Sequence, residues 1–406
     1  MDITVLSVLF LACCLIYGAV RVTSSLAAGE KAGVLRDYKY TPKVSVMLSC
    51  FNEGDAVYKT IESIFNSDYP KDLLEVVAFD DCSKDDSWEW MQRAAIDYPA
   101  TRIFRNDKNS GKAPTLANAS EHTTGNIIVC TDADTIFDVR AIRELTSCFG
   151  DPSIGACGGV IGIANANASL LAQMQTMLYA MSFWLAKPME NITKTVQCLG
   201  GPLVAFRRGL YLDIVPMVFT RNFLGEIIHN GEDRYITQQV LLRGWKTFVT
   251  HKAKCWVGTP VTWGNYFKQQ LRWRRSAIGQ WVGTFFSLHR YISRAGMVAT
   301  MGSMFPMMGN YVWILYLIYL FEAGQFLHML ATLLLIKLFV MPFFGLGFNL
   351  LMGRKDLVQK LKNPILASLL IPFWWGLSFS VVTIWAACTL DDGGWVTRQN
   401  GANGNS

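Results

Sequence analysis

The sequence predicts an α/β domain joined to helices that associate with a membrane. Three β-rich runs in the first third of the chain lead into polar or acidic residues, and a helical segment follows the first of them. Three long apolar runs fill the last quarter. The composition agrees with both parts, because hydrophobic residues make up 51% of the 406 residues and charged residues only 17%. Soluble domains carry about 25% charged residues.

The first apolar segment, residues 3–20, is about as long as a membrane span. A cleaved signal peptide is the alternative, but such peptides begin with cations and end at a small-residue cleavage site. Here Asp2 precedes the segment, and cations beginning with Arg21 follow it. We therefore expect residues 1–24 to be an uncleaved transmembrane anchor. The chain after it is expected in the cytoplasm, because short loops rich in Lys and Arg stay on that side.

Residues 42–262 have the mixed composition of an α/β domain. The runs KVSVMLSC, LLEVVAFDD and NIIVCTDADT predict strands, and the segment that begins at FNEGDAV predicts a helix through Phe65. Strands separated by helices pair in parallel, and such sheets bind ligands beyond the carboxyl ends of their strands. We therefore expect the functional residues of this domain to follow the predicted strands.

Residues 263–296 predict amphipathic helices at a membrane interface, and residues 297–390 predict transmembrane helices. Three apolar runs make up most of the second range: residues 297–321, 326–351 and 365–390. Each is near the ~20 residues that a span requires. Lys337 lies inside one run, where it marks either a functional site or a side chain that reaches the interface. The basic segment 353–363 is expected in the cytoplasm, and residues 391–406 form a C-terminal tail.

The motif TDADT, residues 131–135, places Asp132 and Asp134 where the chain leaves a predicted strand. Both carboxylates can turn toward one ion there. Hard oxygen ligands suit Mg²⁺ or Mn²⁺, which in turn bridge a diphosphate. Two acids in a loop are as often solvated turn residues, so the motif alone leaves metal binding and a turn as equal alternatives.

Three further motifs add residues that could take part in chemistry. FDDCSKDDS puts Asp81 after the second strand, where a carboxylate can accept hydrogen bonds from a base or ribose. NSGKAP puts Lys112 in a loop, where it can meet phosphate as a point charge. GEDRYIT puts Glu232 and Asp233 where a helix can begin. Carboxylates stabilise helix amino termini, so a cap is the alternative to a general base that removes a proton from a hydroxyl group.

The segment of residues 264–287 predicts a helix with two different faces at 100° per residue. One face carries Gln269, Arg272, Trp273 and Ser276. The opposite, apolar face carries Phe267, Leu271, Ile278, Val282 and Phe285. The first face can bind a diphosphate through the guanidinium group and a sugar or base against the indole ring. A plain interface helix, the alternative, explains the cations but not this grouping.

The order of these motifs resembles that of the processive, membrane-integrated family 2 glycosyltransferases of the hyaluronan synthase and chitin synthase type. The matching pieces are CFNE, FDDCSKDDS, NSGKAP, TDADT, CLGGPLVAFRR, GEDRYIT, QQLRW and WVTR. They cover nearly the whole chain in the family's order. The chain departs from the family pattern at Phe51, Ala113 and Val396, where Tyr, Arg and Gly are usual.

The resemblance implies a GT-A catalytic domain, which is Rossmann-like and binds nucleotide sugars, joined to interfacial helices and a transmembrane helical bundle. The implied catalytic residues are Asp233, Glu232, Arg272, Trp273 and Gln269. Asp233 resembles the base, Arg272 would hold the diphosphate, and Trp273 would form the floor under the acceptor sugar. The implied metal ligands are Asp132 and Asp134. The implied metal is Mg²⁺ or Mn²⁺.

The resemblance also assigns substrate contacts along the whole chain. Residues that resemble contacts to the uridine or the donor phosphates are Glu53, Asp81, Lys112 and Asp132. Residues that resemble the lining of the acceptor site are Cys198, Gly201 and Pro202, and Arg234 is also expected to bind substrate. Residues that resemble a gate over the donor are Trp395, Thr397 and Arg398. Three single spans after a cytoplasmic domain would put this gate on the wrong side, so one apolar run is re-entrant, in-plane or crosses twice, or the gate assignment is wrong.

We therefore expect a processive, inverting β-glycosyltransferase of the plasma membrane that adds sugar from a UDP-sugar to a growing polysaccharide and extrudes it through a channel. The expected sugar is N-acetylglucosamine (GlcNAc), alone or alternating with glucuronic acid (GlcA) as in hyaluronan synthesis. Alternatives are a cellulose-like glucosyl polymerase and a non-processive lipid glycosyltransferase. A nucleotide-binding membrane transporter is the alternative from another class.

Two other classes fit poorly. A net charge of +6 without a basic face does not suit a nucleic-acid-binding protein. The ten cysteines have no metal-finger spacing, so neither a zinc site nor a disulfide framework is expected.

Overall fold

The computed structural model describes residues 34–219, 222–223, 226–227, 231–297, 300, 304, 318–319, 321–325, 327 and 361–390. The predicted anchor at residues 1–24 and the tail at 391–406, which carries Trp395, Thr397 and Arg398, lie outside these residues. So does most of the apolar region at 297–390. In the described part, the α/β domain is built on an eight-stranded sheet with the order β3-β2-β1-β4-β7-β6-β10-β5.

The first half of the sheet is parallel, as the sequence predicts. It consists of β1 (Val44–Cys50), β2 (Leu74–Asp80), β3 (Thr101–Arg105) and β4 (Ile127–Asp132), with β1 central between β2 and β4. Strand β2 is buried along its whole length, and β1 nearly so. Strands covered on both faces are apolar throughout rather than alternating, which explains why the sequence makes them recognisable.

The second half is mixed, and it contains none of the three strands that the sequence predicts. It consists of β7 (Val204–Arg207), β6 (Ile154–Ile163), β10 (Lys246–Val257) and β5 (Ile136–Phe137). Strand β7 is antiparallel to both of its neighbours, and β10 is parallel to β6 but antiparallel to β5. Strand β7 has only four residues, three apolar and one basic, which are too few to show a period in the sequence. A separate two-stranded ribbon joins β8 (Asn222–Phe223) and β9 (Glu226–Ile227).

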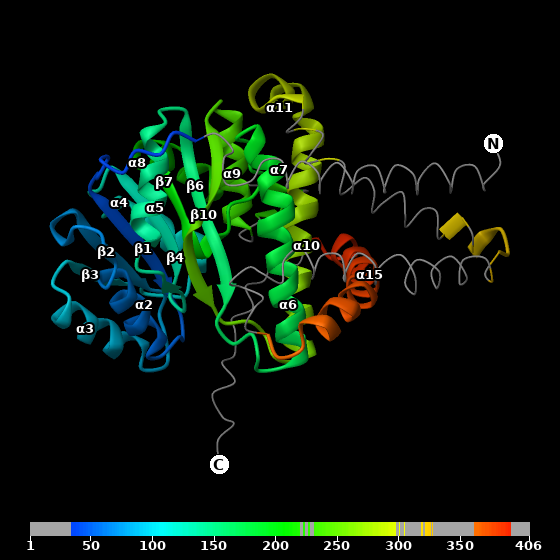
Figure 1. The fold of residues 1–406 in the computed structure, drawn as a ribbon, viewed down its shortest axis with the longest axis horizontal. Helices are drawn as coiled ribbons and strands as arrows, with labels where there is room; N and C mark the ends of the chain where they lie inside the picture. The colour runs from blue at the N-terminus through cyan, green and yellow to red at the C-terminus, as the bar shows by residue number, and fades with distance from the viewer. Residues whose placement is uncertain are drawn as a thin grey trace, which may run out of the picture.

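Helices cover the sheet and extend beyond it (Figure 1). Those packed with the sheet are α2 (Ala56–Phe65), α3 (Ser87–Asp97), α4 (Lys112–Glu121), α5 (Ala141–Ser147), α8 (Arg208–Phe219) and α9 (Glu232–Leu242). The predicted helix that ends at Phe65 is α2. A second group is α6 (Leu170–Met181), α7 (Lys187–Ile192), α10 (Trp263–Phe286), α11 (Leu288–Ala295) and α15 (Pro364–Cys388). A π-helical turn, Ser182–Ala186, joins α6 to α7.

Short 3-10 turns complete the described part of the chain: η2 (Lys71–Leu73), η3 (Cys148–Gly150) and η5 (Gly201–Leu203). Figure 1 shows α6, α10 and α15 together beside the sheet. The start of α15 is attached to the start of α6, because the amide of Asn363 donates to the side chain of Gln173 over 2.8 Å. Its end is attached to α10, because Arg275 donates to the hydroxyl of Thr389 over 2.8 Å. Among the helices that the structure describes, none has both the length and the apolar character that crossing a membrane requires.

Candidate active site

The loops that follow β1 and β2 hold each other at the carboxyl edge of the sheet. Asn52 and Cys82 both have left-handed backbones, with φ of 55° and 65°, which residues other than glycine adopt mainly in turns and functional loops. The amide of Asn52 donates to the hydroxyl of Ser83 over 3.0 Å, and the amide of Glu53 donates to the hydroxyl of Ser87 over 2.9 Å. The backbone that carries Glu53, a predicted uridine contact, is therefore fixed by its neighbouring loop.

The carboxylate of Asp81 shapes the loop that leads into α4. It accepts hydrogen bonds from the amide of Ser110 (2.8 Å), the amide of Gly111 (2.7 Å) and the side chain of Asn106 (2.8 Å). The residue is only 2% exposed. That Asp81 contacts uridine stays a prediction. The structure shows in addition that Asp81 holds the loop that directly precedes Lys112.

Lys112 is the first residue of α4 and joins two predicted site elements. Its ammonium group lies 2.5 Å from a carboxylate oxygen of Asp132 and 3.2 Å from one of Glu232. Burial alone would lower the pKa of Lys112, but the two carboxylates outweigh it and the pKa is raised, so the amine stays charged. The sequence predicts a contact to the diphosphate or the uridine. The structure places this cation between the predicted metal pair and the start of α9.

Gly201 and Pro202 lie against the same group. A Cβ atom on Gly201 would stand 3.0 Å from the ammonium group of Lys112 and 3.9 Å from the Cβ atom of Asp233. The hydroxyl of Thr131, which directly precedes Asp132, donates to the carbonyl of Pro202 over 2.9 Å. The turn at η5 thus closes over the end of β4, and the absence of a side chain at residue 201 gives Lys112 its space.

Cys198, Arg234 and Arg274 form a second set of polar side chains beside Asp233. Cys198 and, less strongly, Asp233 raise the pKa of Arg234, although burial opposes the shift. Burial and, less strongly, the charge of Arg234 together lower the pKa of Arg274 to about 10. Burial also raises the pKa of Cys198. The predicted acceptor-site residue Cys198 and the predicted substrate contact Arg234 are therefore neighbours of the predicted base.

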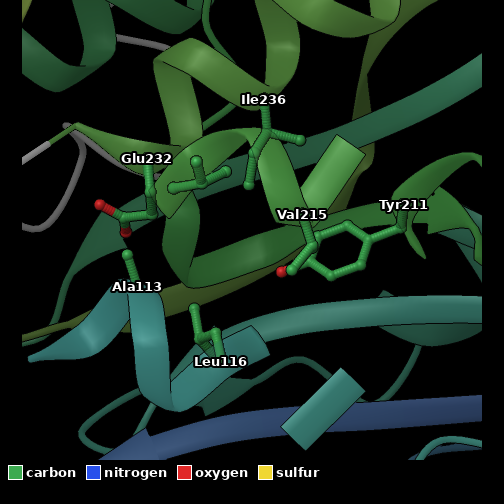
Figure 2. Close-up of a pocket in the computed structure, with 7 residues that line it drawn as sticks. Ala113, Leu116, Tyr211, Val215, Glu232 and Ile236 are labelled. Carbon is green, nitrogen blue, oxygen red and sulfur yellow. The ribbon is translucent and has the colours of Figure 1, made fainter. Parts of the chain in front are cut away.

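A small cavity lies against Glu232 between α4, α8 and α9. Its lining residues are Ala113, Leu116, Tyr211, Val215, Val218, Glu232 and Ile236. Figure 2 shows the carboxylate of Glu232 close to Ala113 at the start of α4. The other lining side chains are apolar except for the phenol of Tyr211. Glu232 therefore faces apolar groups on one side and the ammonium group of Lys112 on the other.

The predicted two-faced helix is confirmed as α10. Its polar face turns toward the domain, since Ser276 is 5% exposed and an oxygen of the Gln269 amide is buried with no hydrogen-bond partner among the described residues. Trp273 stays 38% exposed, with its ring centroid 6.3 Å from that of Tyr179 on α6. The apolar face is only partly covered, because Ile278 is buried whereas Phe285 is 54% exposed.

The two aspartates of TDADT fit the expected cation. Burial raises the pKa of the Cys255 thiol, and the charges of both Asp132 and Asp134 raise it further, so both carboxylates act on the same point. Within the described ranges, no three His, Cys, Asp or Glu side chains gather as a complete metal site. Mg²⁺ and similar ions take one or two carboxylates and complete their shell with substrate phosphates and water. That Asp132 and Asp134 hold such an ion stays a prediction.

The structure brings five of the predicted site residues together. Those gathered around Lys112 are Asp132, Gly201, Glu232 and Asp233. Sequence analysis missed the hydrogen bonds by which Thr131 holds Pro202 and Asn106 holds Asp81. Only the position of these two residues in or near the predicted motifs indicated that they could matter. Sequence analysis also did not predict that Tyr179 lies beside Trp273, because a helical apolar stretch of the sequence does not distinguish such a residue from a core residue.

Comparisons with known proteins agree with this arrangement. The sequence profile of the family described as "Glycosyltransferase like family 2" matches residues 42–276, more than half of the chain. An N-acetylglucosaminyltransferase of Rhizobium sp. (strain N33) is 30% identical over 240 residues, which are 58% of this chain and 52% of the relative. The chain thus spans about half the length of that relative.

A longer match covers nearly the whole chain. The hyaluronan synthase of Streptococcus pyogenes serotype M1 is 24% identical over 397 residues, 95% of this chain and 90% of the relative. Among solved structures, the mannosyltransferase PcManGT from Pyrobaculum calidifontis, in complex with GDP-Man and Mn²⁺, superposes with a TM-score of 0.55 at 19% identity. That similarity covers 91% of this chain and 99% of the other, and it confirms the glycosyltransferase α/β fold of GT-A type.

Proposed function

Because the chain belongs to the glycosyltransferase-like family 2, we propose that it is a processive, inverting β-glycosyltransferase that uses a UDP-sugar. The observation that carries the proposal is the position of Lys112. Its cation is held between Asp132 of the metal pair and Glu232, next to the Cβ-free face of Gly201 and the side chain of Asp233. The proposed phosphate-binding cation, one of the two proposed metal ligands and the proposed base would therefore act close to one another.

The donor would bind along the carboxyl edge of the sheet. Glu53 and Asp81 would lie near the uridine, and Arg272 would take the diphosphate in two parallel hydrogen bonds. Asp132 and Asp134 would hold Mg²⁺ or Mn²⁺, which supplies positive charge to the departing diphosphate when it is bound. The Mn²⁺ in the mannosyltransferase of similar fold supports this choice of ions.

Transfer would then be a single displacement. Asp233 accepts the proton of the acceptor hydroxyl, and the hydroxyl oxygen forms a bond to the anomeric carbon. The bond between that carbon and the phosphate oxygen breaks on the opposite face, and its electron pair leaves with UDP. Lys112 and Arg272 stabilise the charge that develops there. Attack from the opposite face converts an α-linked donor into a β-linked product.

The acceptor sugar would lie on Trp273, whose exposed indole offers a stacking surface. Cys198, Gly201, Pro202 and Arg234 would line its surroundings. The names of the relatives, an N-acetylglucosaminyltransferase and a hyaluronan synthase, support GlcNAc as the donor sugar, alone or in alternation with GlcA. The apolar runs of the sequence, and the cations that follow the first of them, support a plasma-membrane enzyme with a cytoplasmic catalytic domain. Extrusion of the polymer through its apolar helices and a gate at Trp395, Thr397 and Arg398 belong to this proposal.

Release of UDP by the purified full chain tests the proposal. With Mn²⁺ or Mg²⁺ present, we expect UDP release from UDP-GlcNAc and products with many added sugars. No release from any common UDP-sugar would overturn the proposal. Product sizing separates the alternatives within the class, because a single added sugar indicates a lipid glycosyltransferase and a glucose polymer indicates a cellulose-like enzyme.

A further inference from the structure

Gly231, directly before α9, packs against Ser276 of α10. A Cβ atom on Gly231 would stand 1.6 Å from the hydroxyl oxygen of Ser276 and 2.5 Å from its Cβ atom. Real atoms never come so close, so residue 231 leaves the space that Ser276 fills. Gly231 also has a φ of 75°, a left-handed conformation that glycine adopts without strain. Two independent constraints therefore require glycine directly before α9.

A second contact fixes the same two helices farther along. The side-chain amide of Gln238 donates to the hydroxyl of Thr284 over 2.7 Å, and both side chains are buried. From Gly231 to Gln238, and from Ser276 to Thr284, each chain advances about two helical turns. The helices therefore run side by side in the same direction and are held at two points.

The first contact lies between two parts of the proposed catalytic machinery. Gly231 is followed directly by Glu232 and Asp233, and Ser276 stands one helical turn after Arg272. The Ser276 hydroxyl is buried without a hydrogen-bond partner among the described residues. What Ser276 contributes here is therefore the volume that it fills against Gly231.

We propose that Ser276 is a positioning residue, which by filling the space over Gly231 sets the distance between the base Asp233 and the diphosphate-binding Arg272. The proposal rests on the function proposed above. In an inverting transfer the base and the leaving group act on opposite sides of one carbon, so their separation must be kept. A displacement of about 1 Å can lower the rate on the order of 100-fold.

A swap of the two residues tests this role. In Gly231→Ala the new methyl group collides with Ser276, and we expect kcat to fall about 100-fold while the Kd for UDP stays within about threefold. The double variant Gly231→Ala/Ser276→Gly moves the side chain from one helix to the other, and we expect it to recover kcat at least tenfold over the single variant.

Two control variants separate other causes of a lower kcat. Gly244 has a φ of 81° and no atoms within 4 Å of a Cβ, so Gly244→Ala reports the backbone strain alone. Thr284→Ala reports the loss of a contact between the same helices away from the site.

The outcomes separate this proposal from the proposed function. Wild-type UDP release decides the function, and the ratios of variants to wild type decide the role of Ser276. The proposal is wrong if Gly231→Ala keeps as much kcat as Gly244→Ala, or if the double variant recovers nothing. If Gly231→Ala does not fold, Ser276→Gly alone remains decisive. We expect it to lower kcat several-fold at unchanged Kd for UDP, unlike Thr284→Ala, and a wild-type kcat would contradict the proposal.

Discussion

The two sides of the candidate site satisfy their polar groups differently. At the ends of β1 and β2, side chains and backbone amides of neighbouring loops pair with each other, as Asp81 does with three donors of one loop. At the junction of α4, β4 and α9, charges pair across elements far apart in the chain, as Lys112 does with Asp132 and Glu232. The first side holds its shape without substrate. The second keeps a cation and carboxylates in contact where substrate is proposed to bind.

This difference leads us to expect that substitutions on the two sides have different effects. Substitutions on the loop side should alter stability and nucleotide affinity together, because the loops hold their own backbone. Substitutions at the junction should alter the rate of transfer more than the affinity for UDP, since interactions that strengthen only in the transition state act on kcat.

The largest effect is expected at the proposed base. Asp233→Asn keeps the volume of the side chain but cannot accept the proton of the acceptor, and we expect kcat to fall on the order of 10³-fold or more. UDP affinity should stay near that of the wild type, measured by calorimetry. Full turnover in this variant would mean that Asp233 is not the base.

The next largest effect is expected for Lys112. Lys112→Met leaves two carboxylates without their cation, and we expect a loss of about 2 kcal/mol in the free energy of unfolding together with a fall in kcat of about 100-fold. Lys194→Met is the matched control, because Lys194 forms a similarly shielded ion pair with Asp151 away from the site. It should lose comparable stability and keep its kcat. Equal kcat in the two variants would mean that Lys112 is structural.

A smaller effect is expected for Asp81 on the loop side. Asp81→Asn puts an amide donor against backbone amides that now donate to the carboxylate, which costs about 1–3 kcal/mol of stability. If Asp81 acts through the loop, Asp81→Asn and Asn106→Ala should be coupled in a double-mutant cycle of unfolding free energies. Loss of UDP affinity with unchanged stability would instead identify a direct contact to the nucleotide.

The sequence predicted the loop side better than the junction. Strands β1, β2 and β4 are apolar runs that end in polar residues, and local pattern was enough to place them. The two-faced helix α10 followed from its period. Contacts such as those of Lys112 with Glu232 and of Gly231 with Ser276 join segments distant in the chain, and no local pattern encodes them. Only the resemblance to a family indicated that these motifs meet.

The antiparallel strand β7 shows the same limit. Its four residues carry no period, and its direction depends on where the preceding chain enters the sheet. That entry is fixed by the loop before η5, whose Gln197 side chain accepts a hydrogen bond from Tyr291 of α11 over 2.6 Å. A partner nearly a hundred positions away thus helps to determine how the turn at η5 meets β4.

The smallest effect is expected at the opposite edge of the parallel half, far from the proposed chemistry. Glu75 is 8% exposed and accepts hydrogen bonds from the hydroxyl of Ser45 and from the amide of Thr124, and it pairs with Arg102 at 3.0 Å. Burial alone would raise the pKa of Glu75, but these donors and the guanidinium group outweigh it, and the pKa is lowered below its ordinary value of 4.5.

A lowered pKa in the folded state means that ionised Glu75 stabilises the fold at every pH above 4.5. That stability is lost as pH falls through the lower, folded-state pKa. Glu75→Gln should therefore lower the free energy of unfolding by about 1 kcal/mol at pH 7, and its difference from the wild type should shrink below pH 4.5. Thermal unfolding of the variant and the wild type, at pH 7 and below pH 4.5, measures this difference. Because Glu75 lies at the amino ends of the strands, kcat should not change, and a change would mean that the two edges of the sheet are coupled.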